Sequence, residues 1–116
     1  MSDRPGAAGH SLPISTTFEI TGHKTEQVIG ACFGLVVRSM GFSRSFTAQL
    51  TALKKGEVHQ YTELLEDSRR HAVDRMVENA HLMGANAIIG MRFDSSEIGT
   101  SLTEIVAYGT AVVISA

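Results

Sequence analysis

The segment from Tyr61 to Ile89 constrains the fold more than any other part of the chain. It predicts a long amphipathic helix that ends at Gly84 and is followed at once by a β-strand. Glycine at that place supplies the left-handed conformation that closes a helix. Apolar side chains recur along the helix at steps of three, four or seven residues and predict one buried stripe, made of Tyr61, Leu65, Ala72, Met76, Ala80 and Met83.

Apolar segments on both sides of this helix predict β-strands. Residues 14–20 are rich in β-branched side chains and predict a short strand. Residues 26–38 have a centre that is almost continuously apolar, which is typical of a strand covered on both faces. After the helix, we expect strands over 87–94 and 103–114, joined by a polar loop over 95–102 in an antiparallel hairpin.

A shorter helix is predicted over residues 46–55, with Gly56 at its end. The element order is then β-β-α-α-β-β, which predicts an α+β fold with a three- or four-stranded antiparallel sheet and the helices packed on one face. Residues 1–13 are expected to form a flexible N-terminal tail, and residues 14–116 a single domain.

The strands carry more apolar surface than two helices can cover. The helices can cover only one face of the sheet, whereas the middle and last strands are apolar on both faces. Only 19% of the residues are charged. This low charge content leaves apolar surface that has to be hidden from solvent, which favours an oligomer. The second face must therefore be buried by something, and a neighbouring subunit is the simplest candidate.

Composition argues against several classes of partner. The formal net charge is -2 and the sequence contains no basic patch, so we expect no binding to nucleic acid. No apolar run reaches the ~18 residues of a membrane helix, so we expect no membrane contact. Cys32 is the single cysteine, which rules out an internal disulfide and fits a reducing compartment. With no signal-peptide pattern at the N-terminus, the expected location is the cytoplasm.

Four motifs together point to a family: Ile14–Thr17, Gly56–Val58 leading into Tyr61–Leu65, Met83–Gly90, and Ala107–Val113. In these motifs the chain resembles the YbjQ-like family, small bacterial proteins of unknown function that carry a heavy-metal-binding label. The resemblance covers residues 14–116. It implies a dodecin-like subunit that assembles into a ring, a homopentamer, and it implies no established reaction.

The sequence identifies no cofactor, and the label that comes with the resemblance makes a soft or transition metal ion the candidate. Structural zinc needs four Cys or His ligands in close pairs, and the sequence has no such pairs. A ring changes the geometry, because one residue from each subunit can converge on an axis. Cys32, His59 and Met91 are candidates, and their thiol and thioether groups would favour copper(I). Core packing is the favoured interpretation of Cys32 and Met91, and a surface or helix-capping role is the favoured interpretation of His59.

No residue is predicted to be catalytic, because the sequence has no GxSxG motif and nothing pairs two carboxylates. Candidates for binding a small ligand at subunit interfaces are Tyr61, Tyr108 and Asn86, although packing and turn formation compete for each. The first hypothesis is a non-enzymatic ring-forming homo-oligomer that binds a small ligand or a heavy metal. The second is a structural platform for other proteins, and an enzyme with an interfacial site is the least favoured.

Overall fold

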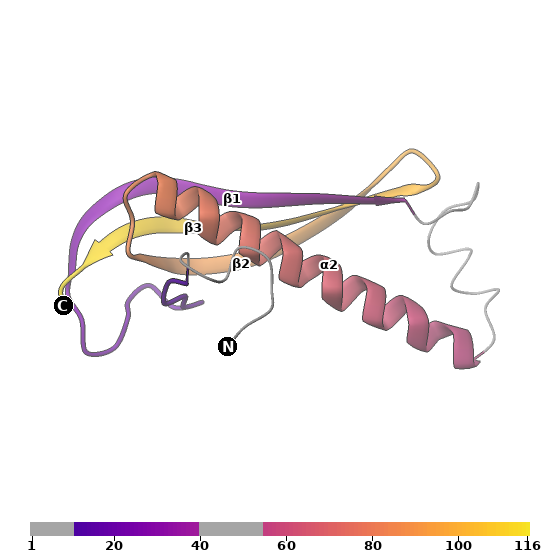
Figure 1. The fold of residues 1–116 in the computed structure, drawn as a ribbon, viewed down its shortest axis with the longest axis horizontal. Helices are drawn as coiled ribbons and strands as arrows, with labels where there is room; N and C mark the ends of the chain where they lie inside the picture. Colours follow the sequence, from indigo (N-terminus) through magenta and orange to yellow (C-terminus); the bar gives the residue numbers. More distant parts are fainter. Residues whose placement is uncertain (1–10, 40–54) are drawn as a thin grey trace.

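The computed structural model describes residues 11–39 and 55–116. The elements are β1 (Thr25–Ser39), α2 (Lys55–Leu82), β2 (Ala87–Ile98) and β3 (Leu102–Ile114). The three strands form one antiparallel sheet in the order β1-β3-β2. Helix α2 crosses one face of this sheet, and its N-terminal half diverges from the β2–β3 hairpin (Figure 1). The predicted α+β class is confirmed, whereas the helix predicted over 46–55 lies outside the described residues apart from its last position.

The strand predicted over residues 14–20 is wrong. Ile14 makes one isolated parallel bridge to Ile88, in which the Ser15 amide donates to the Ile88 carbonyl. The chain then bends, because the Ser15 hydroxyl accepts a hydrogen bond from the Thr17 amide at 2.9 Å. Such a local side-chain bond competes with a strand ladder. The segment therefore pairs with the edge of β2 without continuing as a strand.

The polar loop predicted over residues 95–102 is also wrong for most of its length. Strand β2 continues to Ile98, and the turn is confined to residues 99–101. Gly99 adopts a φ of 67° there, in the left-handed region that glycine tolerates. The outer hairpin is a ribbon with exposed polar side chains, and Ser96 Oγ lies 3.2 Å from Glu104 Oε1 across the strands. Hydrogen bonds between the backbones of β2 and β3 hold this ribbon together, so its side chains do not have to alternate between apolar and polar residues.

Gly84 closes α2 as the sequence predicts. Its φ is 95°, and its amide donates to the His81 carbonyl while the Ala85 amide donates to the Ala80 carbonyl. These two bonds form a Schellman motif, which satisfies carbonyls that would otherwise have no partner at the end of the helix. The chain then enters β2 after Asn86, so the predicted junction between helix and strand is confirmed.

Replacing Gly84 with valine should lower the free energy of unfolding by about 1–3 kcal/mol, because a β-branched residue resists a positive φ. No atom lies within 4 Å of a Cβ built on Gly84, so the loss would come from the backbone alone. Gly84→Asn is the matched control and should be milder, since asparagine tolerates this conformation. Urea denaturation measures both, and an unchanged midpoint for the valine variant would contradict this account of the cap.

The main core lies between α2 and the sheet. Ala72, Met76 and Ala80 of the predicted stripe are fully buried, whereas Met83 is 39% exposed. Ala72, Met76 and Ala80 pack in one cluster with residues from all three strands, including Cys32, Ile88, Met91, Ile105, Ala107 and Ala111. Alternate positions of the hairpin strands point away from α2, as the period of a strand requires.

A smaller cluster occupies the opposite face of the sheet near the end of β3. It contains Ala87, Ile89, Val112 and Ile114, with Ile20 packed against it. The segment that precedes β1 therefore covers this end of the second face. No neighbouring subunit is therefore needed to cover this end of the second face.

Candidate functional site

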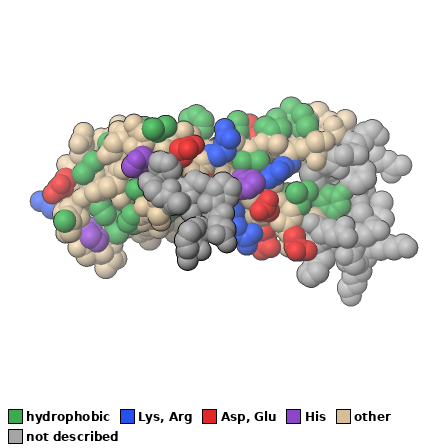
Figure 2. All heavy atoms as spheres, viewed as in Figure 1, with side chains coloured by type: hydrophobic (Ala, Val, Ile, Leu, Met, Phe, Trp, Pro, Cys, Tyr) green, Lys and Arg blue, Asp and Glu red, His purple; other side chains and the backbone are tan. Residues whose placement is uncertain are grey.

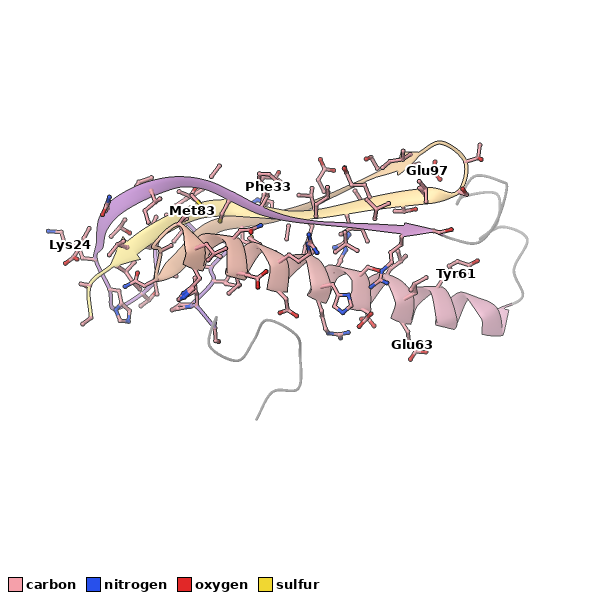
Figure 3. All side chains as sticks on the ribbon, turned by 45° about the horizontal axis from the view of Figure 1, so that its top comes forward. Lys24, Phe33, Tyr61, Glu63, Met83 and Glu97 are labelled. Atoms are coloured by element: carbon pink, nitrogen blue, oxygen red, sulfur yellow. The ribbon has the colours of Figure 1, made fainter. Side chains whose placement is uncertain are left out.

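Strand β1 presents apolar side chains on the side of the sheet opposite to α2. Gly34 faces the helix, since a Cβ built on it would lie 2.2 Å from the Ala72 carbonyl oxygen. Phe33, Leu35 and Val37 alternate with helix-facing positions, so they point to the other side. Their exposed fractions are 58%, 38% and 49%. Figure 3 shows Phe33 on this side of the ribbon, away from α2.

Tyr108 extends the same surface onto the neighbouring strand. It pairs with Phe33 across β1 and β3 and is 42% exposed. We call Phe33, Leu35, Val37 and Tyr108 the open sheet face. Hydrophobic side chains also gather along the upper rim of the molecule in Figure 2, where β1 runs. Within the described part of the chain, no helix or loop packs on these four residues as Ile20 packs on the smaller cluster.

The three candidate ligand residues lie apart within one subunit. Tyr61 is in the N-terminal half of α2 and Asn86 follows the other end of the helix, so about 30 Å of helix separates them. Both ends of the Asn86 side-chain amide are bound to Ile114, because Nδ2 donates to the Ile114 carbonyl at 3.0 Å and Oδ1 accepts from the Ile114 amide at 2.7 Å. Asn86 thus ties the start of β2 to the end of β3. Tyr108 alone lies on the open sheet face.

The structure describes the side chains of two candidate metal ligands, Cys32 and Met91, and both are packed in the core. Cys32 is 2% exposed, and its Sγ lies 3.7 Å from the Gly109 carbonyl oxygen. Burial raises the pKa of the Cys32 thiol, so the thiolate that binds metals is disfavoured. Met91 is packed in the same core, and the His59 side chain lies outside the described residues. Over residues 11–39 and 55–116, no three His, Cys, Asp or Glu residues gather where they could hold a metal ion.

The state of Cys32 leads to a prediction about its reactivity. We expect iodoacetamide to alkylate the folded protein at pH 8 at least ~10-fold more slowly than the urea-unfolded protein, because the buried thiol keeps its proton. Mass spectrometry of timed samples measures both rates, and equal rates would contradict the packing described for Cys32.

The same burial predicts a pH dependence of stability. The pKa of the Cys32 thiol is higher in the folded state than in the unfolded state, so its contribution to stability is complete below the ordinary thiol pKa. Stability should therefore decline as the pH rises above roughly 8.5, the usual value for cysteine. Cys32→Ala should remove this part of the decline, as measured by urea denaturation at a series of pH values.

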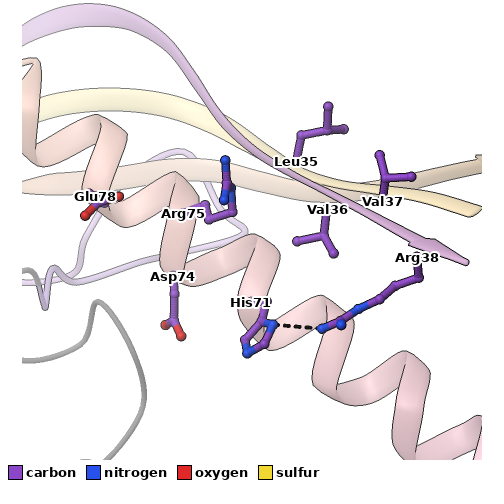
Figure 4. Close-up of a pocket in the computed structure, with 8 residues that line it drawn as sticks. All are labelled: Leu35, Val36, Val37, Arg38, His71, Asp74, Arg75 and Glu78. Carbon is purple, nitrogen blue, oxygen red and sulfur yellow. Dashed lines mark hydrogen bonds between the residues drawn. The ribbon is translucent and has the colours of Figure 1, made fainter.

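A cavity of about 690 Å³ lies between the edge of β1 and the flank of α2 (Figure 4). Arg38, near the end of β1, reaches across it to the helix, where its Nε donates to Ser68 Oγ at 2.9 Å and its Nη2 to His71 Nδ1 at 2.8 Å. Nη2 also lies 3.6 Å from the Asp67 carboxylate. Sequence reasoning missed this group. The spacing of Ser68 and His71 places them on one helix face, but nothing local predicts that Arg38 meets them.

In the part of the chain that the structure describes, one helix covers one face of a three-stranded antiparallel sheet, and this arrangement defines a small α+β domain. A solved structure of a Pediococcus pentosaceus protein of unknown function, from the DUF74 family, has this fold, with a TM-score of 0.59 over 90% of this chain and 98% of that one, at 15% identity. The chain belongs to the YbjQ family, whose model is described as "Putative heavy-metal-binding" and matches residues 12–115.

Relatives in bacteria and archaea agree with this assignment. A UPF0145 protein of Bradyrhizobium sp. (strain ORS 278) is 56% identical over 104 residues, which cover 90% of this chain and 94% of the relative. A UPF0145 protein of Methanoregula boonei is 52% identical over 103 residues, which cover 89% and 85%. The resemblance seen in the sequence motifs is confirmed, and the family extends beyond the bacteria. In the described part of the chain, no helix is long and apolar enough to cross a membrane.

Proposed function

We propose that the protein is a non-enzymatic homo-oligomer, a ring of five subunits, which assembles through the open sheet face and binds a small ligand between subunits. The observation that carries the proposal is the exposure of Phe33, Leu35, Val37 and Tyr108 side by side on a face that α2 leaves uncovered. Burying a large apolar side chain stabilises an assembly by roughly 1.5–3 kcal/mol. Four such residues on each subunit form the centre of an interface.

The position of these residues in the sheet supports assembly. β1 is a long edge strand, with β3 on one side, and an exposed apolar edge strand invites pairing with another chain. The proposed partner is therefore a further copy of this chain. Because the net charge is -2, neither nucleic acid nor a membrane surface is proposed as a partner. The proposed compartment is the cytoplasm.

Tyr108 gives the proposed interface a polar group. Its ring belongs to the apolar surface, and its hydroxyl can hydrogen-bond to a ligand held between subunits. Tyr61 would have to contribute from another part of the ring, because it lies on the distant half of α2. Asn86 is assigned a structural role, since both ends of its amide are bound to Ile114. A small ligand with an apolar body and one polar group would fit these residues.

The description of the family supports a second version, in which the ring binds a heavy metal. The donors would have to come from several subunits, with Cys32, His59 and Met91 as the candidates. Elemental analysis of untagged protein tests this version. A stoichiometric soft metal that is lost in Cys32→Ala would support it, and protein that contains no metal and takes up no added copper or zinc would end it.

Native mass spectrometry tests the assembly. At micromolar concentration we expect a single species of five copies, and a monomer would overturn the proposal. If the ring forms but binds neither a metal nor a small ligand from a metabolite extract, the protein is better described as a structural platform for other proteins.

A further inference from the structure

The two outer edges of the sheet differ in how their backbone groups are bonded. Along β2, the segment that precedes β1 covers part of the edge, because the Ser15 amide donates to the Ile88 carbonyl at 2.9 Å. The Gly90 amide also donates to the Thr17 carbonyl, at 2.7 Å. Strand β1 forms the other edge, and within residues 11–39 and 55–116 no backbone segment pairs with its outer side. An unpaired edge of this kind is a template for a further strand.

Leu35 and Val37 are the residues whose backbone groups face outward along the open part of this edge. The Asn86 amide donates to the Val112 carbonyl, so the backbone of Val112 faces β2. Because backbone direction alternates along an antiparallel strand, Val106 also faces β2 and leaves its partner Leu35 without a bond to β3. The same alternation applies to Val37, two residues further along β1. The N–H and C=O groups of these two residues therefore point away from the sheet.

A groove runs along this edge, between β1 and the flank of α2 (Figure 4). It is the cavity of about 690 Å³, and residues 35–38 form its strand side. The side chains of Leu35 and Val37 point away from α2 in Figure 4, so these two residues line the groove with their backbone. Four residues of a strand span roughly 13 Å, which is the length of a short extended peptide. We call this cavity the edge groove.

Two contacts hold the edge groove in shape. At one end, Asn79 Nδ2 donates to the Phe33 carbonyl at 2.8 Å and occupies the edge just before the open stretch. At the other end, Arg38 is fixed to α2, because its Nε donates to Ser68 Oγ at 2.9 Å and its Nη2 to His71 Nδ1 at 2.8 Å. A peptide that adds to β1 therefore meets a strand that is already positioned against its helix, which reduces the ordering cost of binding.

Arg75 is the charged side chain that faces the open edge. Figure 4 shows its guanidinium directed toward β1, whereas the Asp74 carboxylate points away from β1. Among the described residues, Arg75 makes no hydrogen bond or ion pair. Glu78 lies about one turn further along α2 and repels a second acid on that side. The edge groove therefore favours a peptide that places one acidic side chain beside Arg75.

We propose that the edge groove binds an extended segment of another protein, which adds to β1 as an antiparallel strand. Main-chain hydrogen bonds to Leu35 and Val37 supply affinity, and alternate side chains of the segment supply specificity. On one face its side chains are apolar and continue the open sheet face, and on the other face an acidic side chain meets Arg75. The site lies within one subunit, and the ring is proposed to assemble through side chains of the open sheet face, so the two proposals can fail separately.

Calorimetric titration of the full-length protein with an N-acetylated, C-amidated pentapeptide, threonine-valine-glutamate-valine-threonine, tests the proposal. Its valines pair opposite Leu35 and Val37, and its glutamate faces α2. We expect saturable binding, with hydrogen exchange at the Leu35 and Val37 amides slowed at least ~10-fold at saturation. Exchange at Val36 should stay unchanged, because its backbone already bonds to β3.

The same peptide with both valine nitrogens methylated has no donors for the Leu35 and Val37 carbonyls and should not bind. Equal binding of the methylated peptide would overturn the proposal. So would Leu35 and Val37 amides that are protected before any peptide is added, because the edge of β1 would then be paired in the assembled protein itself.

Arg75→Glu tests the side-chain part of the proposal. The parent should prefer the glutamate peptide to one with lysine in its place by about 3-fold or more, and the variant should reverse this order. Since Arg75 is exposed, the variant should fold. Arg70→Glu is the matched control and should keep the order of the parent, because Arg70 is an exposed arginine of α2 that does not line the edge groove. An unchanged order in Arg75→Glu, or a reversal in both variants, would overturn the proposal.

Discussion

Replacing Gly34 with alanine should lower the free energy of unfolding by about 3 kcal/mol or more, at the upper end of what overpacking costs. A Cβ built on Gly34 would lie 2.2 Å from the Ala72 carbonyl oxygen and 2.3 Å from the Met76 amide nitrogen. Both are backbone atoms of α2, so no side-chain rotation can relieve the overlap. The helix would have to move away from β1, and the core around Met76 would open with it.

Ala31→Val is the matched control for this substitution. Ala31 is an exposed position of the same strand, and the larger side chain meets no helix there. Thermal denaturation followed by circular dichroism should show the alanine variant melting more than about 12 °C lower, with the control close to the parent. Equal melting temperatures for Gly34→Ala and the parent would show that α2 does not pack against β1 as closely as described.

The sequence predicted the parts of the fold that local patterns determine. The stripe at Ala72, Met76 and Ala80 is the buried face of α2, because helical spacing alone puts these residues on one side. Two glycines lie inside the first long apolar segment, and glycine inside a strand is typical of a bulge or a close backbone approach. The structure has one of each, because Gly30 lies at a register shift of β1 and Gly34 lies directly under α2.

Predictions failed where hydrogen bonds to the backbone override the conformation that residue composition indicates. Residues 14–20 have the composition of a strand, yet the Ser15 hydroxyl bends the chain after one bridge. The outer hairpin has the composition of a loop, yet its backbone pairs as far as Ile98 and Leu102. In both places hydrogen bonds to the backbone decide the conformation, and side-chain hydrophobicity carries no information about them.

The candidate sites also contain features that a local sequence pattern predicts and features that it does not. Alternation along residues 103–114 puts Tyr108 on the face opposite to Ala107 and Ala111, and in the structure those two alanines are buried in the main core while Tyr108 is exposed. The group formed by Arg38, Ser68 and His71 was not predictable, because it joins residues about 30 positions apart through the packing of a helix on a strand. Periodicity defines the faces of an element, but the packing register between two elements decides which polar groups meet.

Replacing Phe33 with lysine should dissociate the proposed ring into folded monomers. Phe33 is 58% exposed in the single chain and is not part of either core cluster, so the fold of the monomer should survive. At the proposed interface, however, each subunit would lose the burial of an aromatic side chain, about 1.5–3 kcal/mol. Each would also bury a charge with no partner, which costs more again, and the loss repeats at every contact around the ring.

Phe18→Lys separates this effect from a general increase in charge. Phe18 is 76% exposed and packs beside Gly90, away from the open sheet face, so the variant adds the same charge at a different place. Native mass spectrometry and size-exclusion chromatography should show monomers for Phe33→Lys and an unchanged ring for Phe18→Lys. If the ring persists in Phe33→Lys, the interface between subunits must lie elsewhere on the molecule. Dissociation of both variants would show that net charge, and not contact through Phe33, controls assembly.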